Sequence, residues 1–407
     1  MTDSALHTAE ILLPKPGADM EKWAVVACDQ YTAQPEYWRE AEKVAGDAPS
    51  ALNLILPEAW LEESRERIPA IHQAMADYLS SGTLVSAVPD GFVLTERTTP
   101  AGVRPGLVVA LDLEAYDFSK GSESLIRATE GTVLERVPPR ARIRAGAPLE
   151  LPHVMMLIDD PECTVIEPLL ARREALRPLY DFELMLGGGH LRGWAVEGED
   201  AQAVFKAVDA LNARADGLLY AVGDGNHSLA AAKQCWTELR PTLTPEERLR
   251  HPARFALVEL VALEDEALEF EPIYRVVECD TADFLGALNE VTAGQPGAQT
   301  VTVITAEGEK TVSFAAPTHA LTVGTLQEFI DGYAAAHPGT KCDYIHDEAS
   351  LRALANRPGS VGFLFEGMAK EELFPYVRDH GTLPRKTFSM GEARSKRYYI
   401  EARKIVK

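Results

Sequence analysis

Cysteine is scarce in this chain, with five residues among 407 that are widely spaced and form no C-x-x-C pair. A structural zinc site and a disulfide framework are therefore poorly supported, and a reducing compartment fits better. No apolar run reaches the roughly eighteen residues of a transmembrane helix, so we expect no membrane span. The first ten residues lack a basic segment followed by an apolar one, so we expect no signal peptide and a cytoplasmic location.

Basic residues are also few. Lysine and arginine number 40 against 62 acidic residues, which gives a formal charge of −22. Nucleic-acid surfaces recruit phosphates with clustered Lys and Arg, so we expect a small-molecule partner rather than a nucleic acid, and leave a homo-oligomer open. Any anionic ligand must be held by a local basic pocket. Nearly half of the residues are apolar, which is enough for sizeable globular cores.

The pattern changes most abruptly at residues 218–233. The apolar run Leu218–Val222 predicts a buried strand, Gly223–Gly225 interrupts it, and an alanine-rich helix is expected from Asn226. A helix start leaves its first backbone N–H groups unpaired and carries a partial positive charge. This strand–turn–helix corner therefore predicts a site for an anion such as phosphate.

Polar side chains with complementary chemistry would surround this corner. They are a carboxylate, an amide, an imidazole and a hydroxyl, from Asp224, Asn226, His227 and Ser228. A plainer interpretation stays open, in which Asp224 caps the helix, Gly225 supplies a turn and His227 is a surface residue.

The densest basic cluster lies at residues 124–144. Its arginines are Arg127, Arg136, Arg140, Arg142 and Arg144. The planar guanidinium suits phosphate or carboxylate, so a basic loop here is a candidate anion pocket. The alternative is a solvated charged loop that pairs with nearby acidic residues.

Other polar segments are weaker candidates. Asp159–Asp160 follows an apolar run and could hold a metal, but a turn is favoured. Leu184–Trp194 contains a run of three glycines without the P-loop Lys-Ser/Thr, so we expect a hairpin. Asp29 and Tyr31 follow an apolar strand, where a cap is the commoner role. Lys386 lies in a loop bounded by proline and glycine and is a candidate ligand contact.

Strands and helices alternate along the chain, which predicts a mixed α/β or α+β architecture. We expect an N-terminal α/β part of the core in residues 1–120 and a central part with the corner in residues 121–280. Residues 281–340 have the pattern of a small α+β insertion, and residues 341–407 would complete the core. No repeat or low-complexity linker separates these parts.

The segment Val222–Ser228 resembles the Asp-Gly-His-His-Arg box of the bacterial and archaeal domain-of-unknown-function family 1015. The likeness extends to Arg127–Thr132, Glu271–Val277, Asp343–His346 and Pro384–Phe388. The box is similar to that of free-serine kinases of the ParB/sulfiredoxin-like superfamily, where it lies at a helix start and handles nucleotide phosphates. The resemblance implies a ParB/sulfiredoxin-like core with additional packed subdomains.

Two residues depart from the box. Asn226 stands in place of its first histidine, and Ser228 in place of its arginine. The missing arginine removes a bidentate phosphate clamp, so either Arg127 or Arg140 substitutes for it or the activity differs. Asparagine can still donate to a phosphate oxygen, but it cannot relay a proton.

The resemblance implies a phosphotransferase that uses a nucleotide, ATP or ADP, with Mg²⁺ to phosphorylate a small, serine-like hydroxyl compound. Asp224, His227 and Glu130 are the expected catalytic residues, and Asp224 would also hold the metal. Phosphate contacts are expected from Gly225, Asn226, Ser228, Arg127, Arg140 and Lys386. Two alternatives stay open: a phosphatase or nucleotide hydrolase that uses the same phosphate site, and a nucleotide-binding regulatory protein without catalysis.

Overall fold

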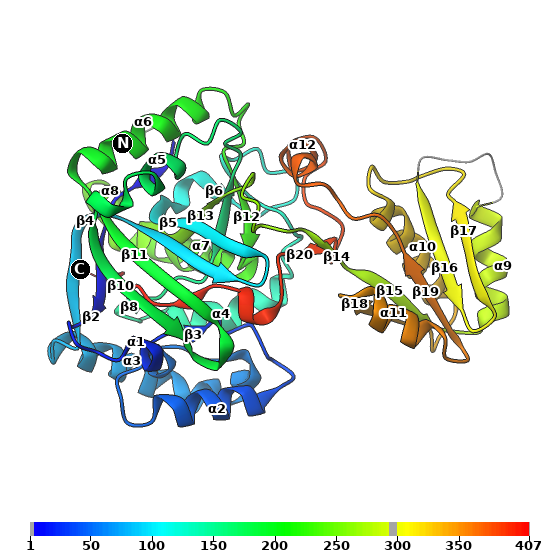
Figure 1. Ribbon diagram of the computed structural model, residues 1–407, viewed down its shortest axis with the longest axis horizontal. Helices are drawn as coiled ribbons and strands as arrows, with labels where there is room; N and C mark the ends of the chain where they lie inside the picture. Colours follow the sequence, from blue (N-terminus) through cyan, green and yellow to red (C-terminus); the bar gives the residue numbers. More distant parts are fainter. Residues whose placement is uncertain (1–3, 293–298, 407) are drawn as a thin grey trace. The chain divides into compact units, whose positions relative to one another are not determined.

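The computed structural model of the chain describes residues 4–292 and 299–406. It divides into two compact units (Figure 1). Unit 1 comprises Met1–Leu268, Val377–Gly381 and Gly391–Lys407, and unit 2 comprises Glu269–Tyr376 and Thr382–Met390. The predicted insertion, residues 281–340, lies within unit 2. Each unit combines a sheet with helices, so the predicted mixed α/β class is confirmed.

Unit 1 is built on an eleven-stranded mixed sheet. Its main path runs β10 (Arg177–Leu184), β11 (Gly189–Glu197), β4 (Leu84–Thr99), β5 (Gly102–Asp112), β13 (Phe255–Ala262), β9 (Met155–Ile158), β12 (Tyr220–Asp224), β7 (Ile126–Ala128) and β6 (Tyr116–Asp117). In addition, β1 (Leu6–His7) pairs with β5 and β2 (Ala9–Pro14) pairs with β4. The pairs β13–β9, β12–β7 and β6–β7 are parallel, and the others are antiparallel.

Both faces of this sheet are buried, because successive side chains of a strand point to opposite faces. Along β5, Val108 and Ala110 join one hydrophobic core, whereas Leu107, Val109 and Leu111 join another. Strands buried on both faces have nearly continuous apolar sequences. This explains why β5 and β13 could be recognised from apolar runs alone.

Helices cover the two faces. The helices of unit 1 are α1 (Met20–Trp23), α2 (Pro35–Ala45), α3 (Ser64–Ser80), α4 (Val137–Arg144), α5 (Glu167–Leu170), α6 (Gly198–Asn212), α7 (Asn226–Leu239) and α8 (Pro245–Arg250). Trp23, Trp38 and Ile71 place α1 to α3 in the first core, and Val208 and Trp236 place α6 and α7 in the second. In Figure 1, α1 to α3 and α6 accordingly lie on opposite sides of the sheet.

The C-terminal segment of the chain returns to unit 1 as two short strands. β21 (Tyr398–Tyr399) pairs with β3 (Val25–Val26), and β22 (Arg403–Lys404) pairs with β8 (Leu149–Glu150). The C-terminal segment thereby lies beside two segments of the first 26 residues, Leu12 and β3, and beside β8, which precedes β9.

Unit 2 contains an antiparallel five-stranded sheet in the order β17 (Gly308–Ser313), β16 (Thr300–Thr305), β19 (Ser360–Leu364), β15 (Tyr274–Glu278) and β18 (Lys341–Ile345). Helices α9 (Thr281–Thr292) and α10 (Thr322–Ala336) pack in one core, and α11 (Glu348–Ala355) packs in another. A separate pair joins β14 (Glu271–Pro272) to β20 (Phe388–Ser389). Helix α12 (Leu373–His380) contributes residues to both units.

Two expectations about local structure need correction. The basic segment is not a loop throughout, because Val137–Arg144 forms α4. Its two prolines occupy the first helical turn, where the missing N–H costs nothing. The expected strand at Trp23–Cys28 is reduced to Val25–Val26, since Trp23 ends α1 instead.

Two local predictions are confirmed. Leu184–Trp194 forms the bend and second strand of a hairpin, with Leu184 opposite Gly189. The Asp160 carboxylate accepts hydrogen bonds from Thr164 and Val165, so this acidic residue caps a turn, as favoured. Within residues 4–292 and 299–406, no helix has the length and apolarity needed to cross a membrane.

Candidate functional site

The predicted corner forms at the junction of β12 and α7. β12 ends at Asp224, and Gly225 precedes the helix with φ +84°, in the left-handed region. A Cβ atom at Gly225 would lie 3.0 Å from Cγ2 of Val154, so both the backbone angle and the available space require glycine. No side chain caps α7. Its positive N-terminal end is therefore not neutralised by a capping carboxylate.

Glu130 lies at the same edge of the sheet as Asp224. β7 and β12 are parallel neighbours, with Ala128 opposite Val222. Glu130 comes two residues after Ala128, and Asp224 comes two residues after Val222. Both acidic residues therefore lie at the same end of the two adjacent strands. The structure thus brings together two of the predicted catalytic residues.

The side chain of Asn226 has a defined orientation. The Thr129 hydroxyl donates to the carbonyl oxygen of Val222 at 2.6 Å, and so it can only accept from the amide nitrogen of Asn226, a long contact of 3.5 Å. The Asn226 amide oxygen points elsewhere. Oδ1 of Asn226 and Oδ2 of Asp224 are both buried without a hydrogen-bond partner. Such atoms are rare in native proteins and call for an explanation such as an ion or a ligand.

A lysine that the sequence analysis missed stands beside Asp224. Nζ of Lys396 lies 3.9 Å from Oδ2 of Asp224, and its side chain is only 10% exposed. Two buried arginines, Arg104 and Arg397, contact or belong to the same segment of the chain as Lys396. Arg104 donates to the carbonyl oxygen of Ser395 at 3.3 Å, and Arg397 pairs with Glu259 at 3.1 Å. Lys396 therefore brings a cation to the corner even though its sequence box lacks an arginine.

His227 is held by the loop after β7. The backbone N–H of Val133 donates to Nε2 of His227 at 3.3 Å. In this contact Nε2 acts as an acceptor, so the ring nitrogen that carries a proton is Nδ1.

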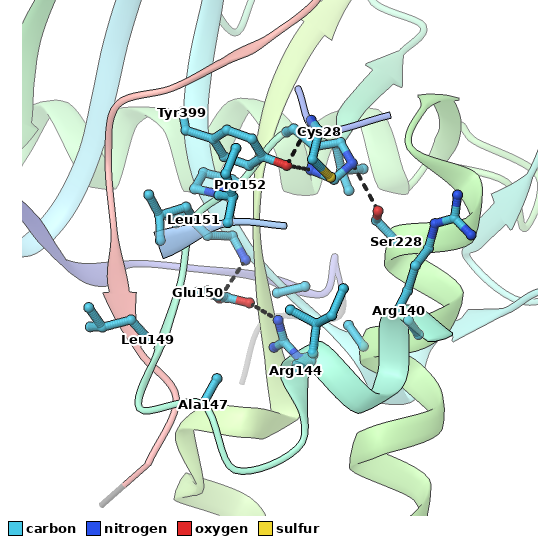
Figure 2. A pocket seen from close by; sticks show the side chains of 18 of the residues that line it. Cys28, Arg140, Arg144, Ala147, Leu149, Glu150, Leu151, Pro152, Ser228 and Tyr399 are labelled. Atoms are coloured by element: carbon cyan, nitrogen blue, oxygen red, sulfur yellow. Dashed lines mark hydrogen bonds and ion pairs between the residues drawn. The ribbon is translucent and has the colours of Figure 1, made fainter. Parts of the chain in front are cut away.

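Ser228 turns to a different part of the molecule. Its Oγ lies 2.8 Å from Nε2 of His153, whose Nδ1 lies 2.7 Å from the hydroxyl of Tyr399. The Tyr399 hydroxyl accepts from the backbone N–H of Cys28 at 3.3 Å. These residues line a cavity of about 140 Å³ (Figure 2). Asp224, Asn226 and His227 are not part of its lining.

The two arginines proposed as substitutes for the missing clamp have other contacts. Arg127 donates to the carbonyl oxygens of Ser124 and Gly217, and Gly217 precedes β12 at the end opposite Asp224. Arg140 lines the cavity and pairs with Glu58. Arg140 therefore fits the alternative interpretation of the basic cluster, in which its arginines pair with acidic residues.

Lys386 belongs to unit 2, where its backbone has φ +54°. Buried Arg275 holds this loop by donating to the carbonyl oxygens of Lys386 at 3.0 Å and Arg385 at 2.9 Å. The role predicted for Lys386 in phosphate binding stays a prediction.

Four residues near the corner and the cavity were missed: Arg104, His153, Lys396 and Tyr399. Only Lys396 carried a signal, since Lys396-Arg397 is a basic pair in an otherwise polar C-terminal stretch. The other three lie in or beside apolar runs that are typical of core. Their proximity to the predicted residues depends on the pairing of strands distant in sequence.

Comparison with known proteins gives a family match and distant structural similarity. The model of a family described as "Protein of unknown function (DUF1015)" matches residues 12–333. No curated protein matches the chain. A conserved hypothetical protein from Pyrococcus furiosus is 11% identical, with a TM-score of 0.34 over 74% of this chain and 95% of its own.

Two further solved structures are similar to the chain. A free serine kinase in complex with AMP is 10% identical, with a TM-score of 0.37 over 74% of this chain and 91% of its own. SbnI with a C-terminal truncation, from Staphylococcus aureus, is 9% identical, with a TM-score of 0.36 over 72% and 82%. At these TM-scores the likeness assigns no activity.

Proposed function

The chain belongs to the family of proteins of unknown function DUF1015, and we propose that it is a phosphotransferase that moves a phosphoryl group from a nucleotide, ATP or ADP, to a small hydroxyl compound. The observation that carries the proposal is the pair of buried, unpartnered oxygens on Asp224 and Asn226, beside Lys396 at the uncapped start of α7. Phosphoryl transfer depends on positioning and charge neutralisation, and this corner offers both.

The oxygens of Asp224 and Asn226 fit Mg²⁺. This ion takes oxygen ligands and is usually held by one or two protein groups together with waters and substrate phosphates. Within the described ranges, no group of three or more His, Cys, Asp or Glu residues is placed to hold a metal, so a complete protein cage is not offered here. Bound Mg²⁺ would neutralise charge that develops on the transferring phosphate.

The other residues have complementary roles. The N–H groups at the start of α7 and the ammonium of Lys396 attract phosphate oxygens. His227, in the first turn of α7, contacts the transferring phosphate. Glu130, at the same sheet edge as Asp224, accepts the proton of the attacking hydroxyl. Lys396 thereby replaces the arginine that the sequence box lacks.

The test is to follow ATP or ADP with Mg²⁺ by phosphorus NMR, with serine and a panel of small alcohols, and without any alcohol. We expect a phosphoester that forms only with an alcohol present. The Asp224→Asn variant should be at least about a hundredfold slower. The matched control is Asp216→Asn, because Asp216 is 84% exposed and asparagine tolerates its left-handed backbone.

Other outcomes decide between activities. Phosphate release at the same rate without alcohol would identify a hydrolase that uses the same residues. Nucleotide-dependent thermal stabilisation that is lost in Asp224→Asn, without turnover by the unmodified protein, would identify a non-catalytic regulator. Equal turnover by Asp224→Asn and Asp216→Asn would place the chemistry elsewhere and contradict the proposal.

A further inference from the structure

The cavity beside α7 is separate from the corner and has the size of a small ligand. It measures about 140 Å³, and Asp224, Asn226 and His227 do not line it. An apolar cavity of about 150 Å³ can hold a benzene molecule. A ligand with roughly six to eight non-hydrogen atoms therefore suits this space.

Most of the cavity wall is aliphatic. Leu54, Leu56, Met75, Ile143, Leu149 and Leu229 contribute to it. Such a wall gains free energy by covering methylene groups, and it offers no partner to a polar group in the middle of the ligand. The polar side chains of the lining are Arg144 with Glu150, the group of Cys28, His153, Ser228 and Tyr399, and Arg140, which pairs with Glu58.

One end carries an arginine with an unused donor. Nη1 of Arg144 donates to Oε2 of Glu150 at 2.5 Å, whereas Nη2 is buried without a hydrogen-bond partner. Glu150 also accepts from Arg403 at 2.7 Å and from the backbone N–H of Leu257 at 3.0 Å. Two guanidinium groups thus share one carboxylate at this end. A second carboxylate, from a ligand, would give these two positive charges two negative partners.

The other end presents a hydroxyl donor. Burial raises the pKa of Tyr399 well above its ordinary value, so its hydroxyl is neutral and keeps its proton. That hydroxyl accepts from Cys28 N–H and donates to Nδ1 of His153, because an imidazole nitrogen is a better acceptor than the nearby thiol. Nε2 of His153 then donates to Oγ of Ser228. In this tautomer His153 does not take the Ser228 proton, which can then be donated to a ligand.

We propose that this cavity binds a short-chain carboxylic acid that carries a hydroxyl or carbonyl oxygen at its far end. The carboxylate pairs with Nη2 of Arg144, the methylene chain lies along the aliphatic wall, and the distal oxygen accepts from Ser228. Figure 2 shows Arg144 with Glu150 at one end of the cavity and Ser228 at the other. Binding needs no nucleotide, so this proposal stands independently of the phosphotransferase.

The test measures the melting temperature and calorimetric affinity of the full chain without nucleotide. The probes are butyrate and 4-hydroxybutyrate, and the uncharged control is butan-1-ol. We expect both acids to raise the melting temperature by mass action and the hydroxy acid to bind more tightly. Butan-1-ol, which cannot pair with Arg144, should have no measurable effect at the same concentration.

Two variants test the two ends. Arg144→Met should weaken both acids about ten- to a hundredfold. The protein should still fold, because Glu150 keeps Arg403 and Leu257 N–H. The matched control is Arg142→Met, an exposed arginine on the same helix, which should bind as the unmodified protein does. Ser228→Ala should reduce the affinity for 4-hydroxybutyrate to that for butyrate and leave butyrate unchanged.

Three results would overturn the proposal. The first is an equal effect of butan-1-ol and butyrate, which would make the cavity a general apolar void. The second is an equal loss in Arg144→Met and Arg142→Met, which would indicate non-specific charge. The third is the absence of binding by either acid at millimolar concentration to the folded, unmodified protein.

Discussion

Glu150 and Asp224 are both carboxylates in the interior of unit 1, but their surroundings differ. Glu150 accepts hydrogen bonds from Arg144, Arg403 and a backbone N–H. Asp224 has one cation at 3.9 Å and a buried oxygen with no hydrogen-bond partner. A satisfied buried charge is a structural element, whereas an unsatisfied one is a candidate for binding something else. The contrast separates residues that hold the fold from those available for function.

The largest expected effect is on stability, at Glu150. Glu150→Gln leaves two buried guanidinium groups without their carboxylate and should lower the free energy of unfolding by about 3–5 kcal/mol. Chemical denaturation measures this loss. As a control, Glu10→Gln removes an exposed pair with Lys404 at 3.6 Å and should cost less than about 1 kcal/mol. Equal losses would mean that the Glu150 network is solvated.

Asp224→Asn should affect turnover more than stability, in contrast to Glu150→Gln. We expect its turnover to fall at least about a hundredfold, which corresponds to roughly 3 kcal/mol of transition-state stabilisation. Its free energy of unfolding should fall by much less than that of Glu150→Gln, because Asp224 has one cation at 3.9 Å and this oxygen has no hydrogen bond to lose. Denaturation and kinetics on the same sample check both. A large loss of stability with little loss of turnover would reverse the contrast with Glu150.

The next largest effect on stability is expected from a substitution in the backbone turn at the corner. Gly225→Ala imposes a side chain at φ +84° and a close contact with Val154, and should destabilise unit 1 by about 1–3 kcal/mol. Gly217→Ala is the matched control. Its φ is +80°, but the nearest atom to the added Cβ lies 3.8 Å away. Thermal unfolding should therefore show a smaller shift for Gly217→Ala, and equal shifts would show that Val154 moves freely.

The smallest expected effect is a pH dependence. Burial raises the pKa of Glu264 from 4.5 to about 7. A carboxyl whose pKa is raised by folding favours the native state below its unfolded pKa, and that contribution is lost as pH rises through the folded value. Glu264→Gln should flatten the decrease in unfolding free energy between about pH 4.5 and 7. Urea midpoints at about pH 5 and about pH 7 measure this change.

Glu150 should act in the opposite direction. Burial pushes its pKa upward, but Arg144 and Arg403 together lower it below 4.5. Its contribution to stability is therefore complete above pH 4.5 and is lost as pH falls below that value.

For Glu264 the contradicting result is a Glu264→Gln variant whose stability still falls toward neutral pH as in the unmodified protein. The decrease would then belong to another group.

The parts of the fold that depend on local signals could be predicted from the sequence. Pro35–Ala45 forms the expected helix, and the corner forms at Gly225 as expected. In both places proline, glycine and hydrophobic periodicity act within a few residues. The prediction of a loop at helix α4 was wrong because a pair of prolines usually ends a helix, whereas here it begins one.

The candidate site could be predicted only in part. Asp224, Asn226 and Glu130 lie where two neighbouring strands end at one sheet edge. The sequence indicated the end of β12 but not that of β7. Lys396 lies more than a hundred residues further along the chain and reaches Asp224 only in the folded protein. The orientation of Ser228 toward His153, away from the corner, is also a property of packing. No local pattern reports such distant contacts.

The return of the C-terminal segment to unit 1 has a consequence during synthesis. Asp224 and Glu259 leave the ribosome long before Lys396 and Arg397, with which they form ion pairs. At about 5–20 residues per second, translation from Asp224 to Lys396 takes roughly ten to thirty seconds. During this interval these two carboxylates lack those partners. A ribosome that stalls in this stretch would present the quality-control machinery with a polypeptide that has its core strands but lacks the segment that pairs with β3 and β8.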